Sequence, residues 1–208
     1  MVIGGGPVAE RKVRGLLNAN ALVRVVSPVA TPGLAVLAEQ DAVEWRQKTY
    51  DRADLDGAVL VFAATNDTGT QQAVHHDART AGLLVNVADA PEECDFQVPA
   101  VVRRGGLTLS VATNGMSPAV AAMVRRQLEL EFGEEYGLLT TIAGLLREQL
   151  LAEGRESEEI KFLFEKILCE DIVEWLRQRQ WDRVQQHVND VLGWPAGSVW
   201  EILNKVIP

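Results

Sequence analysis

The sequence predicts an α/β fold: a Rossmann-like, doubly wound parallel sheet, then a small β-hairpin with a helix, and last an all-α C-terminal domain. Apolar β-branched runs alternate with helical spacing over residues 1–98, and only helical periodicity remains from residue 136 onward. Strands that alternate with helices in this way build parallel sheets with right-handed crossovers. We therefore divide the chain into a Rossmann domain (residues 1–98), a segment with a hairpin and a helix (99–132) and a helical domain (133–208).

The apolar runs of the first domain show no alternation, which is typical of strands buried on both faces. Such strands are expected over residues 21–27, 58–65 and 83–88. Helices are expected over residues 7–20, 32–40 and 69–81. The first apolar run, residues 1–3, is shorter than the roughly 5–6 residues of an average strand, so either residues that precede it are missing or the first strand is genuinely short.

The elements after residue 98 change in character. Apolar and polar residues alternate over 107–113, and with 98–102 this predicts an antiparallel hairpin. Ser117 and Pro118 are typical of a helix start, and the apolar face of that helix should carry Val120, Val124 and Leu128. Further helices are expected over residues 136–152, 157–179, 181–192 and 198–206.

Composition excludes several classes of function. The net charge of −9 makes nucleic acid an unfavourable partner, and no apolar run reaches the roughly 20 residues of a membrane span. The N-terminus lacks the residue order of a signal peptide, so we expect a cytoplasmic protein without a membrane partner. Cys94 and Cys169 show no disulfide or zinc spacing and are expected to be reduced thiols, and no metal ligand is assigned from the spacing of His and Cys.

Residues 4–9, GGGPVA, stand between a strand end and a helix start, where glycines let the backbone approach a pyrophosphate. The alternative is a purely structural turn. The second strand ends in Val26-Ser27-Pro28, without the acidic residue that often binds the ribose of NAD. Because no arginine follows to hold a 2′-phosphate, NAD is preferred over NADP.

Three other segments carry polar side chains at the edge where ligands of such sheets bind. Asn66 and Asp67 follow one strand and either contact the ligand or cap the next helix. Asp89 follows another and either accepts a proton or serves as a turn residue. Residues 113–118, TNGMSP, either receive substrate carboxylates at a helix start or form a capped loop.

Taken together, these segments resemble the precorrin-2 dehydrogenase family, which includes the N-terminal module of siroheme synthases. The motifs that carry the resemblance are residues 4–12 (GGGPVAERK), 63–67 (AATND), 86–91 (NVADAP) and 114–118 (NGMSP), with Arg125-Arg126 on the helix that follows. They cover residues 1–130, whereas the remaining helices fit only in general character.

The resemblance implies a homodimer joined through residues 99–132, with NAD on the Rossmann module and the helical domain closing over the substrate. It makes Asp89 the catalytic base, and the same aspartate would serve metal insertion in relatives that also act as chelatases. It assigns to the cofactor Gly4, Gly5, Gly6, Pro7, Val8, Pro28, Val29, Thr65, Asn66 and Asp67. It assigns to the substrate Thr113, Asn114, Gly115, Met116, Ser117, Arg125 and Arg126.

The function expected from the resemblance is NAD-dependent oxidation of precorrin-2, a polycarboxylated tetrapyrrole, to sirohydrochlorin. Arg103, Arg104, Arg125 and Arg126 would offset the negative charge of that substrate. Two other hypotheses remain open: an NAD-sensing module with a helical effector domain, and an oxidoreductase for another small substrate.

Overall fold

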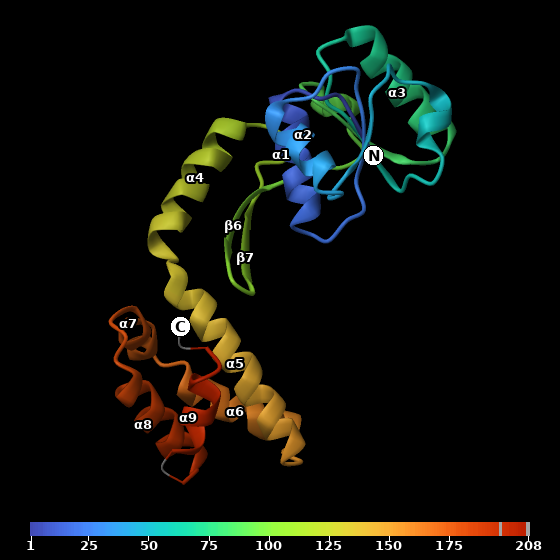
Figure 1. Cartoon of the computed structure of the whole chain (residues 1–208). Helices are drawn as coiled ribbons and strands as arrows, with labels where there is room; N and C mark the ends of the chain where they lie inside the picture. Colours follow the sequence, from blue (N-terminus) through green and yellow to red (C-terminus); the bar gives the residue numbers. More distant parts are fainter. Residues whose placement is uncertain (196, 207–208) are drawn as a thin grey trace. The chain divides into compact units, whose positions relative to one another are not determined.

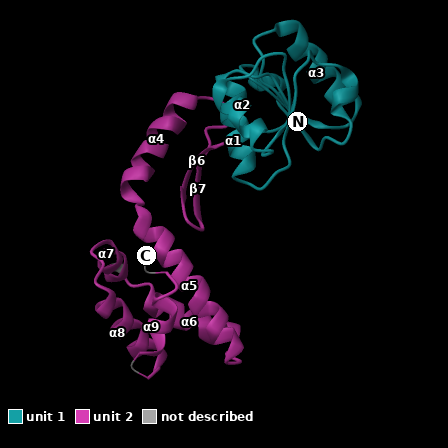
Figure 2. Cartoon of the chain, in the orientation of Figure 1, with its two compact units in different colours: residues 1–98 teal, residues 99–208 magenta. Residues whose placement is uncertain are grey.

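The computed structural model describes residues 1–195 and 197–206. The chain divides into two compact units, Met1–Val98 and Pro99–Pro208 (Figure 2). The first unit contains two clusters of buried apolar side chains and the second contains one, so each unit buries a core of its own.

The first unit is built on a five-stranded sheet with the order β3-β2-β1-β4-β5. All of its strand pairs are parallel, as the sequence predicted. The strands are β1 (Val2–Ile3), β2 (Arg24–Val26), β3 (Glu44–Arg46), β4 (Leu60–Ala63) and β5 (Leu84–Val87). Strand β1 has only 2 residues.

Three helices and two short 3-10 turns complete the first unit (Figure 1). They are α1 (Pro7–Leu17), α2 (Pro32–Glu39), α3 (Thr68–Thr80), η1 (Arg52–Leu55) and η2 (Pro91–Glu93). Side chains of α1 and α2 share one core cluster with Val25 and Phe62, whereas those of α3 share the other with Val26 and Val61. Successive strand residues thus enter different clusters, which is why the strands read as unbroken apolar runs.

The strand order reverses beside β1, whose neighbours are β2 on one side and β4 on the other. Ile3 is in register with Val26 of β2 and with Ala63 of β4, so the three strands end at the same level of the sheet. Ligands of open parallel sheets bind outside the carboxyl ends of the strands at such a reversal. We therefore expect a ligand-binding site among the loops that follow these strands.

Strand β3 was not predicted. Its residues Glu44, Trp45 and Arg46 include only one apolar side chain, and it lies at the edge of the sheet. Charged side chains are usual on edge strands, where they discourage pairing with other chains. Glu44 accepts hydrogen bonds from Arg24 of β2 at 2.7 Å and from Arg46 of its own strand at 2.7 Å, so ion pairs replace apolar packing here.

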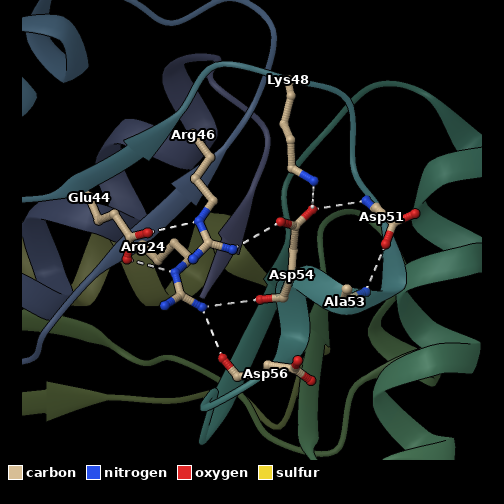
Figure 3. Close-up of polar contacts among 8 residues, drawn as sticks. All are labelled: Arg24, Glu44, Arg46, Lys48, Asp51, Ala53, Asp54 and Asp56. Atoms are coloured by element: carbon tan, nitrogen blue, oxygen red, sulfur yellow. Dashed lines mark hydrogen bonds and ion pairs between the residues drawn. The ribbon is translucent and has the colours of Figure 1, made fainter.

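The ion pairs of β3 continue to a buried carboxylate (Figure 3). Asp54 of η1 is only 1% exposed. Its oxygens lie 3.1 Å from the Arg46 guanidinium and 2.9 Å from the Lys48 ammonium, and they accept a hydrogen bond from the Asp51 amide at 2.9 Å. The carboxylate thus binds two cations, one at the end of β3 and one just after it, together with a backbone amide just before η1.

The second unit begins with the predicted hairpin, β6 (Ala100–Arg104) and β7 (Leu107–Val111), whose antiparallel register pairs Ala100 with Val111. Helices α4 (Pro118–Glu131) and α5 (Glu134–Ala152) follow. The remaining helices are α6 (Ser157–Ile167), α7 (Glu170–Arg177), α8 (Trp181–Leu192) and α9 (Ser198–Leu203). Within residues 1–195 and 197–206, none of the helices combines the length and the hydropathy that a membrane crossing requires.

The prediction of one helix over residues 157–179 was wrong. The chain leaves the helix after Ile167, and Cys169 has extended backbone angles at the start of α7. The apolar face of α6 would continue near Asp171 and Glu174, whereas the buried side chains of α7 are Ile172 and Leu176. A break re-aims that face toward the core, and the His187 ring, 3.2 Å from the Ile167 carbonyl, satisfies the exposed helix end.

Candidate functional site

The glycine loop after β1 packs directly on two neighbouring loops. A Cβ atom on Gly4, whose φ is +121°, would lie 2.2 Å from the carbonyl oxygen of Ala64. A Cβ atom on Gly5 would lie 1.9 Å from the carbonyl oxygen of Val29. Side chains are excluded at both positions by the protein itself, which brings the ends of β1, β2 and β4 together.

Gly6 differs from its neighbours, because a Cβ atom there would meet nothing within 4 Å. It is also the N-cap of α1, and no side chain caps that helix end. Pro7 is the first helical residue, followed by Val8. Free N–H groups and the positive end of the helix dipole therefore face an open position, which suits the pyrophosphate of a dinucleotide.

The loop after β2 is held close to the glycine loop. The Thr31 amide donates to the Gly5 carbonyl at 2.9 Å, and the Ser27 hydroxyl donates to the Val29 carbonyl at 2.6 Å. The Gln47 amide donates to the Pro28 carbonyl at 3.4 Å. Val29 itself is 73% exposed, so an apolar side chain stands free beside the glycines.

The loop after β4 carries Thr65, Asn66 and Asp67. Asp67 is the N-cap of α3 and accepts a hydrogen bond from the Thr70 amide at 2.7 Å. Hydrogen bonds from Thr70 lower the pKa of this carboxyl. One oxygen of Asp67 is thus used to cap a helix, whereas Thr65 and Asn66 occupy the loop at the carboxyl edge.

Asp89 lies in the turn after β5, two residues beyond Val87. It is exposed and has a φ of +62°, in the left-handed region. Just before it, the Ala88 amide donates to the Ala63 carbonyl of β4 at 2.8 Å, which ties the turn to the sheet. No hydrogen bond to the carboxylate itself is made by the residues that the structure describes, although its charge acts on the ammonium of Lys12.

Sequence reasoning missed residues that support this edge. Gln71 of α3 donates to the Thr65 carbonyl at 2.7 Å and to the Ala88 carbonyl at 3.4 Å, so it joins two of the loops. Lys12 of α1 donates to the Asn86 side chain at 2.6 Å. Lys12 stands beside Val13 of the buried helix face, a weak signal that it was not simply part of a basic surface.

In the second unit, the segment between β7 and α4 folds into a tight turn. Asn114 and Gly115 have φ values of +50° and +78°. The Thr113 hydroxyl donates to the Ser117 carbonyl and accepts from the Ser117 amide, both at 3.1 Å. Ser117 caps α4 by accepting from the Val120 amide at 3.2 Å, so the predicted cap exists, and Met116 is left exposed.

The arginines of the second unit differ in their contacts and in their exposure. Arg104 donates to the Phe132 carbonyl at 2.8 Å and to the Glu129 carbonyl at 3.0 Å, which satisfies the end of α4. It is therefore committed to the fold, contrary to the expectation that it offsets substrate charge. Arg125 forms an ion pair with Glu129, whereas Arg103 and Arg126 are exposed.

The structure thus gathers the residues assigned to the cofactor, with Asp89, at the strand ends of the first unit. The residues assigned to the substrate belong to the second unit, at the start of α4 and along it. Within the described ranges, no group of three or more His, Cys, Asp or Glu side chains could hold a metal ion.

Comparison with known proteins agrees with this arrangement. Residues 1–100 match a protein family described as "Putative NAD(P)-binding", and residues 104–129 match one described as "Sirohaem biosynthesis protein central". The siroheme synthase of Methylobacillus flagellatus is 35% identical over 192 residues, which are 92% of this chain. That of Nitrosomonas eutropha is 38% identical over 169 residues, or 81% of the chain.

The chain is a homologue of these siroheme synthases over 81–92% of its own length. It covers 41% and 36% of these two relatives, so it spans about two fifths of the length of the curated siroheme synthases it matches. A solved structure described as "SirC, precorrin-2 dehydrogenase" superposes with a TM-score of 0.75 at 23% identity, covering 93% of both chains. That likeness extends over both units and shows that the fold is shared.

Proposed function

We propose that the chain is an NAD-dependent dehydrogenase that oxidises precorrin-2 to sirohydrochlorin in siroheme synthesis. The observation that carries the proposal is an aspartate, Asp89, with no hydrogen-bond partner in the described part of the chain, at the same sheet edge as an open glycine loop, in a chain that is 35% identical to a siroheme synthase. The substrate comes from the function of the relatives, and the reaction type comes from the geometry of this edge.

The residues at this edge fit a dinucleotide. Gly6 and the uncapped start of α1 would receive the pyrophosphate. Pro28 and Val29 would lie along the adenosine half, and Thr65 and Asn66 along the nicotinamide half. NAD is preferred over NADP because no arginine directly follows Ser27 and Pro28 in the sequence, and the guanidinium of Arg46 on the neighbouring strand is bound to Glu44 and Asp54.

The nicotinamide ring would accept a hydride from the reduced tetrapyrrole. Asp89 would take up the proton that a ring carbon loses, because the residue is exposed and its carboxylate accepts no hydrogen bond in the described part of the chain. The turn at Thr113–Ser117 and the exposed Arg126 would bind substrate carboxylates. Arg125 would contribute as well, from its partly buried ion pair with Glu129.

The proposal is tested by anaerobic incubation of the chain with enzymatically generated precorrin-2 and NAD. NADH and sirohydrochlorin are expected to form in equal amounts, above a control without enzyme. Asp89→Asn should bind NAD normally but turn over about 10²–10⁴-fold more slowly, the usual contribution of a general base. An Asp89→Asn variant as fast as the parent would remove the base assignment.

The same measurement separates the alternatives. An NAD-sensing module would bind the nucleotide without turnover, and an oxidoreductase for another small substrate would fail to bind a large tetrapyrrole. Neither alternative gives a role to Asp89 and to the Thr113–Ser117 turn together, which is why we favour the dehydrogenase.

We further propose that the chain forms a homodimer through residues 99–132, with residues 133–208 as a separate helical domain. Val120, Met123 and Leu130 of α4 are 45%, 52% and 88% exposed. Their spacing of three and seven residues places them along one side of the helix, where an apolar partner surface would cover them.

Cys94 and Cys169 are both free, and the cytoplasmic compartment stays a prediction.

A further inference from the structure

Lys12 places a charged ammonium in a half-buried position, where removing the charge from water is unfavourable. Its side chain is half-buried beneath the sheet edge, and its Nζ lies 4.9 Å from the centre of the Phe62 ring. Burial, with the charge of Arg11, lowers the pKa of this amine. The negative charge of Asp89 opposes this lowering of the pKa, but no carboxylate within the described part of the chain forms an ion pair with Lys12. The cost of removing the ammonium from water is therefore offset mainly by its polar contact and by the Phe62 ring.

The contact that holds the ammonium leads toward Asp89. Lys12 Nζ donates to Asn86 Oδ1 at 2.6 Å, and Asn86 is only 8% exposed. The other end of the Asn86 amide donates to the Phe96 carbonyl at 3.0 Å and to Cys94 Sγ at 3.3 Å. The three side chains thus form one hydrogen-bonded series from α1 to the segment that follows the turn.

Cys94 ends the series on the two residues that bracket the turn. Its sulfur accepts from the Val87 amide at 3.2 Å and lies 3.3 Å from both the Val87 and the Ala90 carbonyl oxygens. The thiol proton can serve one of these carbonyls at a time. Asp89, left-handed and free at its carboxylate, therefore sits on a backbone that is tied on both sides.

We propose that Lys12 is a positioning residue: through Asn86 and Cys94 it holds the Asp89 turn in its left-handed conformation. A methionine at position 12 would fill the same space beside Phe62 without a desolvation cost, so stability alone gives no reason for a lysine there. The consequence for catalysis rests on the proposed function of Asp89, whereas the consequence for the turn does not.

The experiment measures two quantities on the full chain. Hydrogen exchange reports how often the amides of residues 88–90 open, and steady-state kinetics with precorrin-2 and NAD reports turnover. In Lys12→Met we expect exchange in the turn to rise about tenfold, the equivalent of one lost hydrogen bond. We expect kcat to fall by at least about tenfold with KM for NAD nearly unchanged, because misplacing a base costs the chemical step.

Matched variants make the outcome specific. Arg11→Met removes an exposed cation from the same helix and should leave both quantities at the parent value. Lys12→Arg, which keeps a charged donor, should recover part of kcat. Cys94→Ala breaks the series at its other end and should give the same two changes, and the double variant Lys12→Met, Cys94→Ala should cost little more than either alone.

Each result decides something. Unchanged exchange at residues 88–90 in both Lys12→Met and Cys94→Ala overturns the positioning role, whatever the activity. Faster exchange with an unchanged kcat keeps the structural link but removes its catalytic meaning. A parent chain without turnover on precorrin-2 refutes the proposed function, and the exchange data still test the link between Lys12 and the turn.

Discussion

The three adjacent glycines after β1 have different neighbours, and this makes their roles separable. Gly6 is open, so Gly6→Ala should leave the Tm within a degree or two while a methyl group keeps the pyrophosphate at a distance. We expect the Kd for NAD to rise about tenfold or more, or about 1.4 kcal/mol. Thermal unfolding and a fluorescence titration with NAD measure the two effects.

Gly5→Ala is the matched comparison, because its new Cβ atom would lie 1.9 Å from the Val29 carbonyl oxygen. It should lower the Tm strongly as well as weaken binding. If Gly6→Ala bound NAD as tightly as the parent, the glycine loop would be a structural turn only, and the dinucleotide assignment would lose its main support.

The Asp54 carboxylate predicts a pH dependence of stability. Burial by itself raises its pKa, but hydrogen bonds from Lys48, from the Asp51 amide and from Arg46 outweigh burial and hold the pKa below the ordinary value. Stability from this group is therefore complete above about pH 4, the unfolded-state value, and is lost as the pH falls through the lower folded-state pKa. Asp54→Asn should cost about 2 kcal/mol at neutral pH.

Urea unfolding of parent and Asp54→Asn as a function of pH provides the measurement. The difference between them should be constant near neutrality and shrink below about pH 4, as the parent carboxyl is protonated. A difference that persisted unchanged in acid would mean that packing, not charge, connects η1 to the strand end.

Single residues differ in how far sequence could predict them. The glycine loop and Asp89 were visible because their signals lie in adjacent positions next to strand ends. Lys12, Gln71 and Cys94 were not, because each acts on a segment distant in sequence whose neighbourhood depends on the strand order. A lysine within an apolar helix face was the one hint available.

At the level of elements, α5 contains two glycines in contrasting surroundings. A Cβ atom on Gly137 would lie 3.0 Å from the carbonyl carbon of Arg104 and 3.1 Å from the Gly105 amide nitrogen, because the hairpin turn packs on the helix there. A Cβ atom on Gly144 would meet nothing within 4 Å. Alanine favours a helix over glycine by about 1 kcal/mol, so the two substitutions should have opposite signs.

We expect Gly144→Ala to raise the free energy of unfolding by up to about 1 kcal/mol and Gly137→Ala to lower it by about 1–3 kcal/mol. Chemical denaturation of the two variants measures both. Stabilisation by Gly137→Ala would show that the hairpin turn yields easily, and that its packing on α5 is looser than the atomic distances indicate.

The sequence predicted the elements whose burial leaves a recognisable apolar pattern, and it missed the strand that is held by ion pairs. The buried strands β4 and β5 were expected because both faces are apolar. Strand β3 was missed because ion pairs of Glu44 and Arg46 replace that pattern. The break at Cys169 was missed because amphipathic periodicity continues across it with only a shift in phase.

For the whole molecule, the exposed apolar side of α4 predicts the state of assembly. Met123→Glu places a charge on the 52% exposed Met123 and should convert a dimer to a monomer, because burying that carboxylate in an apolar interface is costly. Sedimentation velocity of parent and variant measures the change.

A parent chain that sedimented as a monomer would remove the dimer proposal.

The overall order of a parallel α/β unit followed by a hairpin and helices was predictable, because each part has its own period. How the residues 99–208 subdivide was not settled by pattern, since helical periodicity runs through both α4 and α5 without a composition change.

The left-handed backbone of Asp89 affects how any mutational survey of this family should be designed. Alanine tolerates a φ of +62° poorly, at a cost of about 1–2 kcal/mol, whereas asparagine visits that region readily. An alanine scan would therefore combine two losses at this position, the carboxylate and the shape of the turn. Paired asparagine and glycine substitutions would separate the two losses, because both residues adopt this backbone conformation readily and neither supplies a carboxylate.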